Sequence, residues 1–408
     1  MKVSLFGLGL WPWACAAAIA IAPARALAEV RIGFAEALAL SRKRAPSVAV
    51  ARATESVAEA DSRTGGLYPN PTVSAGTNTE TVRLSLGASV PLLILGQRGA
   101  ALAAGRAEYL AAKIDTQISM TDLRAATGQA FVALWLAERT ARARQDAALV
   151  SHKLESAVAG RVELGSSPEL EGLRAHAETL RADMDARAAE DLVAASAADL
   201  SAWIGVPFDE SLRVAGDPEV PSGAPPIADL WPRVAKNPTV QRAFAEVRAS
   251  EARATSERAQ VRPLMTVDVG ADIGDRTLPG VTNYRAQLGL ELPIFNQRGP
   301  FVEREERRAV AARSKILAEQ VRLSAELIIA YRTFRALTQQ VQTLEGGVVP
   351  AAAAAARATE ESYSLGRAPL VAVLDAERAR IEAALALIQS QAARANAWID
   401  VEHAIGVQ

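Results

Sequence analysis

The sequence contains one uninterrupted helical pattern of unusual length. From Arg98 to Glu163 there is no proline, and apolar residues recur at spacings of three and four: Leu110, Ile114, Ile118, Phe131, Leu134, Leu154, Val158 and Val162. At 1.5 Å per residue, a helix of roughly 65 residues extends on the order of 100 Å. Compact domains rarely contain such an element. The abundant alanine and the low aromatic content, 5%, suit close helix packing better than a thick globular core.

A short turn ends this pattern and a second helical pattern follows. In the segment Leu164-Gly165-Ser166-Ser167-Pro168, glycine suits a helix C-cap and proline suits the first turn of the next helix. We predict that this next helix runs from about Glu169 to Ile204, with Leu170, Leu173, Leu180 and Met184 on one side. Two helices joined by so short a turn should lie antiparallel.

Two extended segments precede the long helix. A helix is predicted from Ile32 to about Ala60, broken near Pro46. Tyr68-Pro69-Asn70-Pro71 is then typical of a turn that leads into an extended segment at 72–77. A second extended segment is predicted at 82–90, and the two together indicate a β-hairpin.

This order of elements occurs twice. Arg83-Leu84-Ser85-Leu86-Gly87-Ala88-Ser89-Val90-Pro91 matches Arg285-Ala286-Gln287-Leu288-Gly289-Leu290-Glu291-Leu292-Pro293 at Arg, Leu, Gly, an aliphatic residue and Pro, 202 positions later. The first copy continues into Gln97-Arg98-Gly99 and the second into Gln297-Arg298-Gly299. The sequence therefore predicts a duplicated unit in which short strands lead into a long helix.

The second copy repeats the helical hairpin as well. Its long helix should begin near Phe301, and Gly346-Gly347 with Pro350 should kink or interrupt it. The turn returns as Leu365-Gly366-Arg367-Ala368-Pro369, and a last helix is predicted from about Leu370 to Ile405. Between the copies, the proline-rich segment 206–238 is interpreted as a linker or a lateral elaboration.

The N-terminus indicates export. A largely apolar run from Leu5 to Ile21 is followed by Ala26-Leu27-Ala28, a small-x-small cleavage pattern, so we expect a signal peptide at 1–28. The alternatives are an uncleaved anchor or a lipidated Cys15, the only cysteine. The predicted division is then a first repeat at 29–205, a proline-rich linker at 206–236 and a second repeat at 237–408.

Composition and motifs argue against nucleic-acid binding and catalysis. The formal net charge is −1, without a basic block. The histidines His152, His176 and His403 are scattered and lack a metal-binding or catalytic spacing. We expect no enzyme activity, no cofactor, no resident metal and no nucleic-acid partner.

The four predicted strands constrain the assembly. A two-stranded hairpin is not stable alone, and backbone groups inside a membrane must all be paired, so strands there must close into a barrel. Four strands are too few to enclose one, but several protomers could each contribute four. The predicted fold class is therefore mostly α with a small β part: an oligomeric outer-membrane β-barrel continued by a periplasmic α-helical barrel. Such an assembly is a conduit.

The chain resembles the TolC family of outer-membrane efflux proteins. The resemblance rests on the duplication, the Tyr68-Pro69-Asn70-Pro71 turn, the Leu292-Pro293-Ile294-Phe295-Asn296 segment, and the glycine turn followed by Leu374-Asp375-Ala376. Pro-Ile-Phe-Asn-Gln-Arg-Gly further resembles the CzcC-like heavy-metal branch. The brief loop Thr77 to Thr81 departs from the family pattern.

The resemblance implies partners and sites. It implies a homotrimer with a shared twelve-stranded barrel, a periplasmic adaptor (a membrane fusion protein) and an inner-membrane pump of the proton-driven resistance-nodulation-division type. The expected adaptor-contact tips are Leu164, Gly165, Ser166, Ser167, Leu365, Gly366, Arg367 and Ala368. The expected barrel–tunnel hinge is Pro91, Gln97, Arg98, Pro293, Gln297 and Arg298. The two arginines could meet lipid headgroups, a neighbouring carboxylate or solvent.

Two other interpretations remain at this point. A soluble periplasmic coiled-coil adaptor would contain long helices too, but it predicts one hairpin flanked by larger β domains. A secreted structural fibre would require a sustained heptad, which the sequence lacks. The cargo, whether metal cations or small toxic compounds, is left open.

Overall fold

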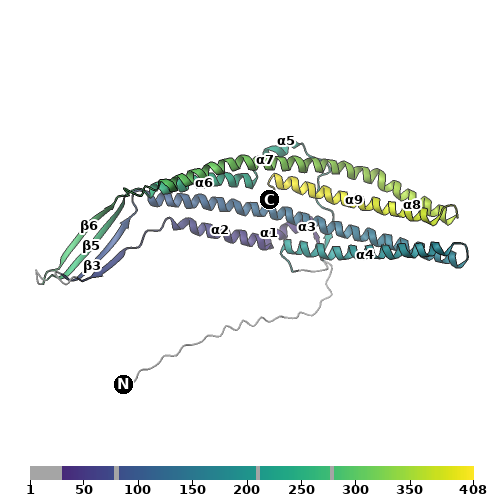
Figure 1. The fold of residues 1–408 in the computed structure, drawn as a ribbon, viewed down its shortest axis with the longest axis horizontal. Helices are drawn as coiled ribbons and strands as arrows, with labels where there is room; N and C mark the ends of the chain where they lie inside the picture. The colour runs from purple at the N-terminus through teal and green to yellow at the C-terminus, as the bar shows by residue number, and fades with distance from the viewer. Residues whose placement is uncertain (1–29, 78–81, 208–211, 276–279) are drawn as a thin grey trace, which may run out of the picture.

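A computed structural model describes residues 30–77, 82–207, 212–275 and 280–408. The predicted signal peptide 1–28, with Cys15, lies outside the described residues. The same holds for 78–81 of the first strand loop and 276–279 of the second. Within the described ranges the chain is an elongated molecule, with a sheet at one end and two helical turns at the other (Figure 1).

The first repeat follows the predicted order. Its elements are β1 (Val30–Gly33), α1 (Phe34–Arg44), α2 (Pro46–Thr64), β2 (Thr72–Gly76), β3 (Val82–Leu92), α3 (Gln97–Glu163) and α4 (Glu169–Ile204). Pro46 begins α2, where its fixed φ suits a first turn and its missing N–H costs no hydrogen bond. The 67-residue helix α3 is unbroken. The predicted long helix and its short turn are confirmed.

The second repeat has the same order with one interruption. Its elements are α6 (Pro238–Ala259), β5 (Leu264–Asp275), β6 (Asn283–Glu291), α7 (Gly299–Thr343), η1 (Leu344–Val348), α8 (Val349–Ser364) and α9 (Leu370–Ala404). The segment η1 is a π-helix that contains Gly346 and Gly347, so the predicted interruption is confirmed. Pro350 lies in the first turn of α8.

The segment between the repeats is more ordered than a plain linker. It contains β4 (Leu212–Ala215) and α5 (Ile227–Val234). β4 pairs in parallel with β1. The helix had been predicted to begin at Ile32, so the prediction was wrong for Ile32 and Gly33, which belong to β1. Leu230 and Val234 of α5 are buried with residues of α7 and α9. The segment therefore packs on the side of the helices, in agreement with a lateral elaboration.

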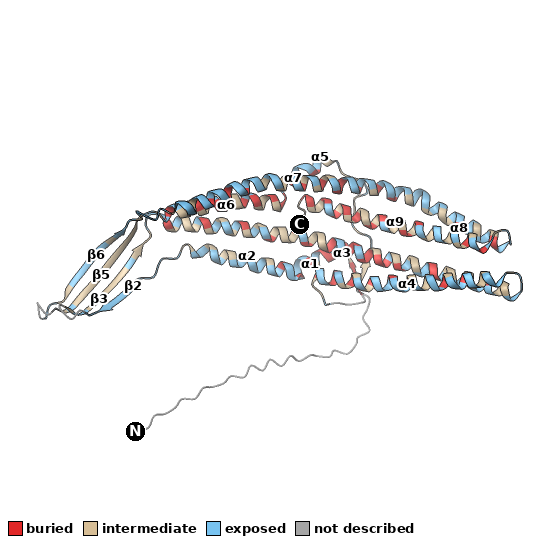
Figure 2. Cartoon of the chain, viewed as in Figure 1, coloured by how far each residue is buried: buried red, intermediate tan, exposed pale blue. Residues whose placement is uncertain are grey.

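The other four strands form one antiparallel sheet in the order β2-β3-β5-β6. β3 pairs with β5, and so joins the two repeats, with Val90 opposite Val267. Strands β2 and β6 stand at the edges. None of the described residues in these four strands is buried (Figure 2).

The core lies between the helices and is built largely from alanine. In its largest cluster α1, α3, α4, β4 and α9 meet, and the Phe34 ring lies edge-on to that of Phe131, with 5.3 Å between centroids. Burying a side chain of this size contributes about 1.5–3 kcal/mol. A smaller cluster near the helical turns joins Val158 of α3 to Tyr363 of α8 and Leu370 of α9. The two hairpins are thus packed together in the middle of the molecule and again near the helical turns.

Candidate functional site

One face of the sheet is largely apolar, with Asp275 at its far end as the one acidic position among its described residues. Successive side chains of a strand point to opposite faces, and directly opposed residues share a face. The register therefore places these residues together: Val73, Ala75, Leu84, Leu86, Ala88, Val90, Leu92, Met265, Val267, Val269, Ala271, Ile273, Tyr284, Ala286, Leu288 and Leu290. Val73 and Tyr284 are 77% and 84% exposed. Such a face requires an apolar surrounding or partner.

The opposite face is mainly polar. It carries Thr72, Ser74, Ser85, Ser89, Thr266, Asp268, Asp272, Arg285, Gln287 and Glu291. Asp272 of β5 accepts hydrogen bonds from Ser85 Oγ of β3 (2.7 Å) and is ion-paired with Arg285 Nε of β6 (3.1 Å). Three strands are therefore joined through this polar face.

Glycines allow close packing on the polar face. A Cβ added at Gly270 would lie 2.9 Å from the backbone oxygen of Leu86, and one at Gly87 would lie 2.7 Å from Ser74 Oγ. Gly76 is different, because a Cβ there would meet nothing within 4 Å. A side chain larger than hydrogen would therefore crowd the neighbouring strand at Gly270 and Gly87 but not at Gly76.

The hinge residue Gln97 ties the long helix to the sheet. β3 continues through Pro91 to Leu92, so the turn into α3 begins two residues later than predicted. Gly96 adopts a left-handed conformation (φ 92°) just before α3. The buried Gln97 side chain donates from Nε2 to the carbonyl oxygen of Pro263 (3.2 Å) and accepts from the Leu95 N–H (3.1 Å). This amide links α3 to the residue before β5.

The two hinge arginines have different partners. Arg98 Nε donates to the Gly66 carbonyl (2.6 Å), and its guanidinium lies over the Tyr68 ring. Arg298 is the only non-glycine of the described residues with positive φ, 52°, and it is ion-paired with Glu257 (2.6 Å). A neighbouring carboxylate is therefore the partner of Arg298.

The remaining hinge residues, Pro293 and Gln297, lie between β6 and α7. Pro293 is half-buried, whereas Gln297 is exposed. The two copies of the hinge thus share a sequence but not a set of contacts.

The two predicted tips have the same backbone geometry. Gly165 and Gly366 have φ values of 69° and 71°. In each turn the N–H of the glycine and the N–H of the next residue donate to carbonyl groups of the preceding helix. The longer-range bonds run from Ser166 to Arg161 O (2.9 Å) and from Arg367 to Ser362 O (2.8 Å). This is the Schellman arrangement that ends a helix. The side chains on these turns lie largely in solvent: Leu164, Gly165, Ser166, Leu365, Gly366 and Arg367 are exposed, and Ser167 and Ala368 are half-buried.

Both tips lie at the end of the molecule far from the sheet (Figure 1). Leu164 is 85% exposed and Leu365 is 60% exposed. The structure therefore brings the eight predicted tip residues to one end, with an apolar side chain on each turn.

The sequence did not predict the contacts between the two hairpins. Arg161 of α3 donates to the Tyr363 carbonyl of α8 (3.2 Å) and lies over the Tyr363 ring. Arg378 of α9 donates from Nε to Glu178 of α4 (3.0 Å). This hydrogen bond lowers the pKa of Glu178, against the opposing effect of burial. These contacts connect α3 and α4 to α8 and α9 near the tips.

A cluster of ion pairs joins α6, α7 and α3 closer to the sheet. The Glu305 side chain is 1% exposed and accepts from Arg253 (2.9 Å). Arg304 (2.9 Å) and Arg308 (2.8 Å) also bind it. Arg253 in turn binds Glu246 and Glu108. The members of this cluster come from three helices that are far apart in the sequence, so no local sequence motif predicts it.

Each histidine pairs with a single carboxylate on a facing helix. His152 lies 3.0 Å from Asp183, His176 lies 2.7 Å from Glu155, and His403 lies 2.9 Å from Asp122. The hydrogen bond to Asp122 raises the pKa of His403, although burial opposes it. Within the described ranges, no three His, Cys, Asp or Glu residues converge in a way that could hold a metal ion. Nor is any helix in this part of the chain long and apolar enough to cross a membrane.

Known proteins resemble this chain both in sequence and in fold. Residues 234–407 match the family model described as outer membrane efflux protein. The chain is 24% identical over 335 residues to the cobalt-zinc-cadmium resistance protein CzcC of Cupriavidus metallidurans. This alignment covers 80% of this chain and 79% of that protein. The predicted resemblance is thereby confirmed.

Solved structures with the same fold include two bacterial membrane proteins. A membrane protein from Pseudomonas aeruginosa superimposes with a TM-score of 0.77 at 16% identity, covering 91% of this chain and 90% of that chain. The outer membrane protein VceC from Vibrio cholerae gives a TM-score of 0.75 at 16% identity, over 91% of this chain and 96% of that chain. The predicted fold class, mostly α with a small β part, is confirmed.

Proposed function

We propose that this chain is an outer-membrane efflux protein of the TolC family and the passive exit duct of a tripartite efflux system, as its match to the outer membrane efflux protein family and its similarity to CzcC support. It is located in the outer membrane with a periplasmic portion. The family consists of transport ducts rather than enzymes. The observation that carries the proposal is the pairing of a two-faced sheet with long helical hairpins that leave it in one direction (Figure 1).

We propose that three protomers close one barrel of twelve strands. The apolar face of each sheet would contact lipid and the polar face would line the bore, as in outer-membrane barrels generally. In one chain β2 and β6 leave unpaired edges, and an unpaired edge is costly in a membrane. Pairing β6 of one protomer with β2 of the next would satisfy both edges.

The hinge residues would then direct the helices out of the membrane. Gln97, Arg98 and Arg298 each bind a group on a neighbouring segment, so they fix the angle between sheet and helices. The proposed division places the first efflux repeat at 29–205 and the second at 237–408, after cleavage of residues 1–28.

The family works with adaptor and pump components. We propose that the tips contact a periplasmic adaptor, and that the pump is of the proton-driven resistance-nodulation-division type. Leu164 and Leu365 support this assignment, because each exposes an apolar side chain at the end farthest from the sheet. As substrates we propose metal cations, by analogy with the relative CzcC, a cobalt-zinc-cadmium resistance protein, with small toxic compounds as the broader class.

We further propose that the duct opens when the two hairpins separate. Arg161–Tyr363 and Arg378–Glu178 are the polar contacts that would break first, since they join the hairpins close to the tips. Bundled helices shift between discrete packings, so such a change is a switch and not a gradual bend.

Fractionation tests the duct, and crosslinking tests the opening. We expect a heat-sensitive trimer in the outer-membrane fraction; a soluble periplasmic monomer would refute the proposal. No cysteine occurs after Cys15, so a bifunctional reagent can join Ser166→Cys to Arg367→Cys specifically. Crosslinking should hold single-channel conductance low, and reduction of a cleavable reagent should restore it. Unchanged conductance in the crosslinked protein would contradict the opening step.

Transport itself is tested in cells. A strain that lacks its own efflux duct, and carries this chain with its pump and adaptor, should tolerate more zinc, cobalt or cadmium. The double variant Leu164→Ser, Leu365→Ser should lose this tolerance while remaining trimeric. Leu192→Ser is the matched control, because Leu192 is as exposed as Leu365, 60% each, and lies on α4 away from the tip.

A further inference from the structure

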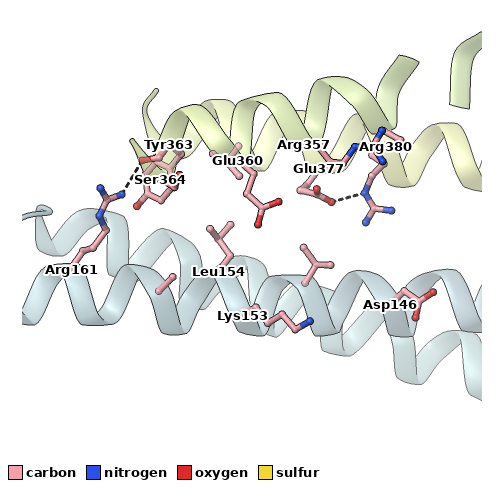
Figure 3. A pocket seen from close by; sticks show the side chains of 14 residues that line it. Asp146, Lys153, Leu154, Arg161, Arg357, Glu360, Tyr363, Ser364, Glu377 and Arg380 are labelled. Carbon is pink, nitrogen blue, oxygen red and sulfur yellow. Dashed lines mark hydrogen bonds and ion pairs between the residues drawn. The ribbon is translucent and has the colours of Figure 1, made fainter. Parts of the chain in front are cut away.

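A cavity of about 700 Å³ lies between the two hairpins, between α3 on one side and α8 with α9 on the other (Figure 3). Pockets that hold drug-sized ligands have volumes of about 300–1,000 Å³. Val150 and Leu154 of α3 and Val373 of α9 give the cavity an apolar wall. This cavity is therefore large enough for a small organic molecule and able to bury its apolar part.

Cationic side chains reach the cavity from both sides. Lys153 comes from α3, whereas Arg357 and Arg380 come from α8 and α9 (Figure 3). Arg161 lines the end near Tyr363. Within the described residues, no carboxylate lies within ion-pair distance of Lys153, Arg161 or Arg357. Lys153 and Arg357 are exposed, and Arg161 is already bound to Tyr363. Lys153 and Arg357 therefore form a solvated cationic rim beside the apolar wall, which favours a ligand with an apolar body and an anionic group.

Anionic side chains offset only part of this charge. Glu377 and Arg380 form an ion pair at 2.8 Å, so their charges neutralise each other. The other charged residues that line the cavity are two acidic ones, Asp146 and Glu360, and three basic ones, Lys153, Arg161 and Arg357. Glu360 extends into the space between the hairpins (Figure 3), so it would repel an acidic group placed beside it. The acidic group of a ligand is therefore expected at Lys153 and Arg357.

We propose that this cavity binds an amphipathic organic anion, with an apolar body and one acidic group. The acidic group binds Lys153 and Arg357, and the apolar body lies on Val150, Leu154 and Val373. A ligand held in this way touches α3 and α8 together, so it stabilises the contact between the hairpins. The proposed binding site depends only on the cavity and the side chains that line it. Its effect on the duct rests on the proposed function.

Calorimetric titration with 1-naphthalenesulfonate tests the site. The full chain is purified as the trimer and kept in an amphiphilic polymer, because detergent micelles would absorb the probe. We expect saturable binding to the wild type, and at least tenfold weaker binding to Lys153→Ala, Arg357→Ala. The conservative pair Lys153→Arg, Arg357→Lys should bind within a few-fold of the wild type. The control pair Lys315→Ala, Arg335→Ala removes two exposed cations of α7 and should leave binding unchanged.

The outcomes that overturn the proposal are distinct. Absence of saturable binding to a folded wild-type trimer refutes the site, and so does an equal loss in the control pair. Tighter binding of 1-naphthylmethylammonium than of the sulfonate would show that Asp146 and Glu360 decide the charge preference, and would also refute it. If the sulfonate binds as expected but single-channel conductance does not fall, the effect on opening is wrong and the site stands.

Discussion

Replacing Glu305 with glutamine removes the charge at the centre of the cluster that joins α6 to α7. The variant keeps the size of the side chain, and it can still accept hydrogen bonds. It leaves Arg253, whose side chain is 23% exposed, without the most deeply buried of its three carboxylate partners. The perturbation is therefore electrostatic and leaves the packing almost unchanged.

The expected loss of stability follows from how buried each partner is. The hydrogen bond between Glu305 and Arg253 joins two largely buried charges, and such a bond is worth about 1.5–3 kcal/mol. Arg304 and Arg308 are half-exposed, so solvent screens their pairs to about 0–1 kcal/mol each. Arg253 keeps Glu246 and Glu108, which limits the penalty. We expect a total destabilisation of about 2–4 kcal/mol.

Thermal melting of the helical circular dichroism signal measures this loss. At one fixed scan rate, the midpoint of Glu305→Gln should lie several degrees below that of the wild type. Glu306→Gln is the matched control, because Glu306 is the next residue and pairs with Arg258 in solvent, with its side chain 52% exposed. A control shift as large as that of Glu305→Gln would refute the reasoning from burial.

The same pair of proteins predicts a pH dependence. Burial alone would raise the pKa of Glu305, but hydrogen bonds from Arg253, Arg304 and Arg308 outweigh it and lower the pKa. The stabilisation is therefore fully present above the ordinary carboxyl pKa of about 4.3 and is lost as the pH falls through the lowered value. The difference between wild type and Glu305→Gln should be constant near neutral pH and shrink below about pH 4. A difference that instead grew on acidification would contradict the assignment.

Three further substitutions test the sheet, the opening step and the core. Gly270→Ala should reduce the heat-sensitive trimer on gels, because its Cβ would lie 2.9 Å from a backbone oxygen of the neighbouring strand, whereas Gly76→Ala, with nothing within 4 Å, should not. Glu178→Gln weakens the contact between α4 and α9 and should raise the open probability in single-channel recordings; since the pKa of Glu178 is lowered by its hydrogen bond to Arg378, acidification below about pH 4 should have the same effect on the wild type. Phe131→Ala removes a fully buried ring and should destabilise the helical part by about 3–5 kcal/mol, measured by melting.

Local signals in the sequence were sufficient for the long helices. The first hairpin was predicted at 98–163 and 169–204, and the helices α3 and α4 occupy Gln97–Glu163 and Glu169–Ile204. Both ends are set by residues that act within one turn: Gly165 supplies the left-handed conformation, and Pro168 suits the start of α4. Helix boundaries of this kind need no tertiary information.

The missed strands depended on distant partners. β1 and β4 are four residues each, and they pair across most of the first repeat, Val30 with Leu212. Neither contains a turn signal or enough residues to show a period of two. Parallel pairing between segments so far apart is decided by the surrounding core, where Ile32 and Leu212 are both buried. Periodicity within a short window carries no such information.

Identical residues also acquired different roles in the two repeats. Gln97-Arg98-Gly99 and Gln297-Arg298-Gly299 have the same sequence, but α3 begins at the glutamine and α7 begins at the glycine. Gly96 holds the left-handed position in the first copy, and Arg298 holds it in the second. This shift of two residues buries Gln97 and leaves Gln297 exposed. A repeat therefore predicts the element and not the contacts of its side chains.

The contacts between hairpins show how the duplication shapes the molecule. Arg378 and Glu178 are 200 positions apart, close to the offset between the repeats, so they are nearly equivalent residues in the two copies. Arg161 and Tyr363 are 202 positions apart, which is the same relation. Equivalent positions touch only if the two hairpins lie side by side in the same direction. Because they do so from the sheet onward, Gly165 and Gly366 reach the same end of the molecule (Figure 1). One periplasmic partner could therefore contact both tips of each protomer, which a single hairpin could not offer.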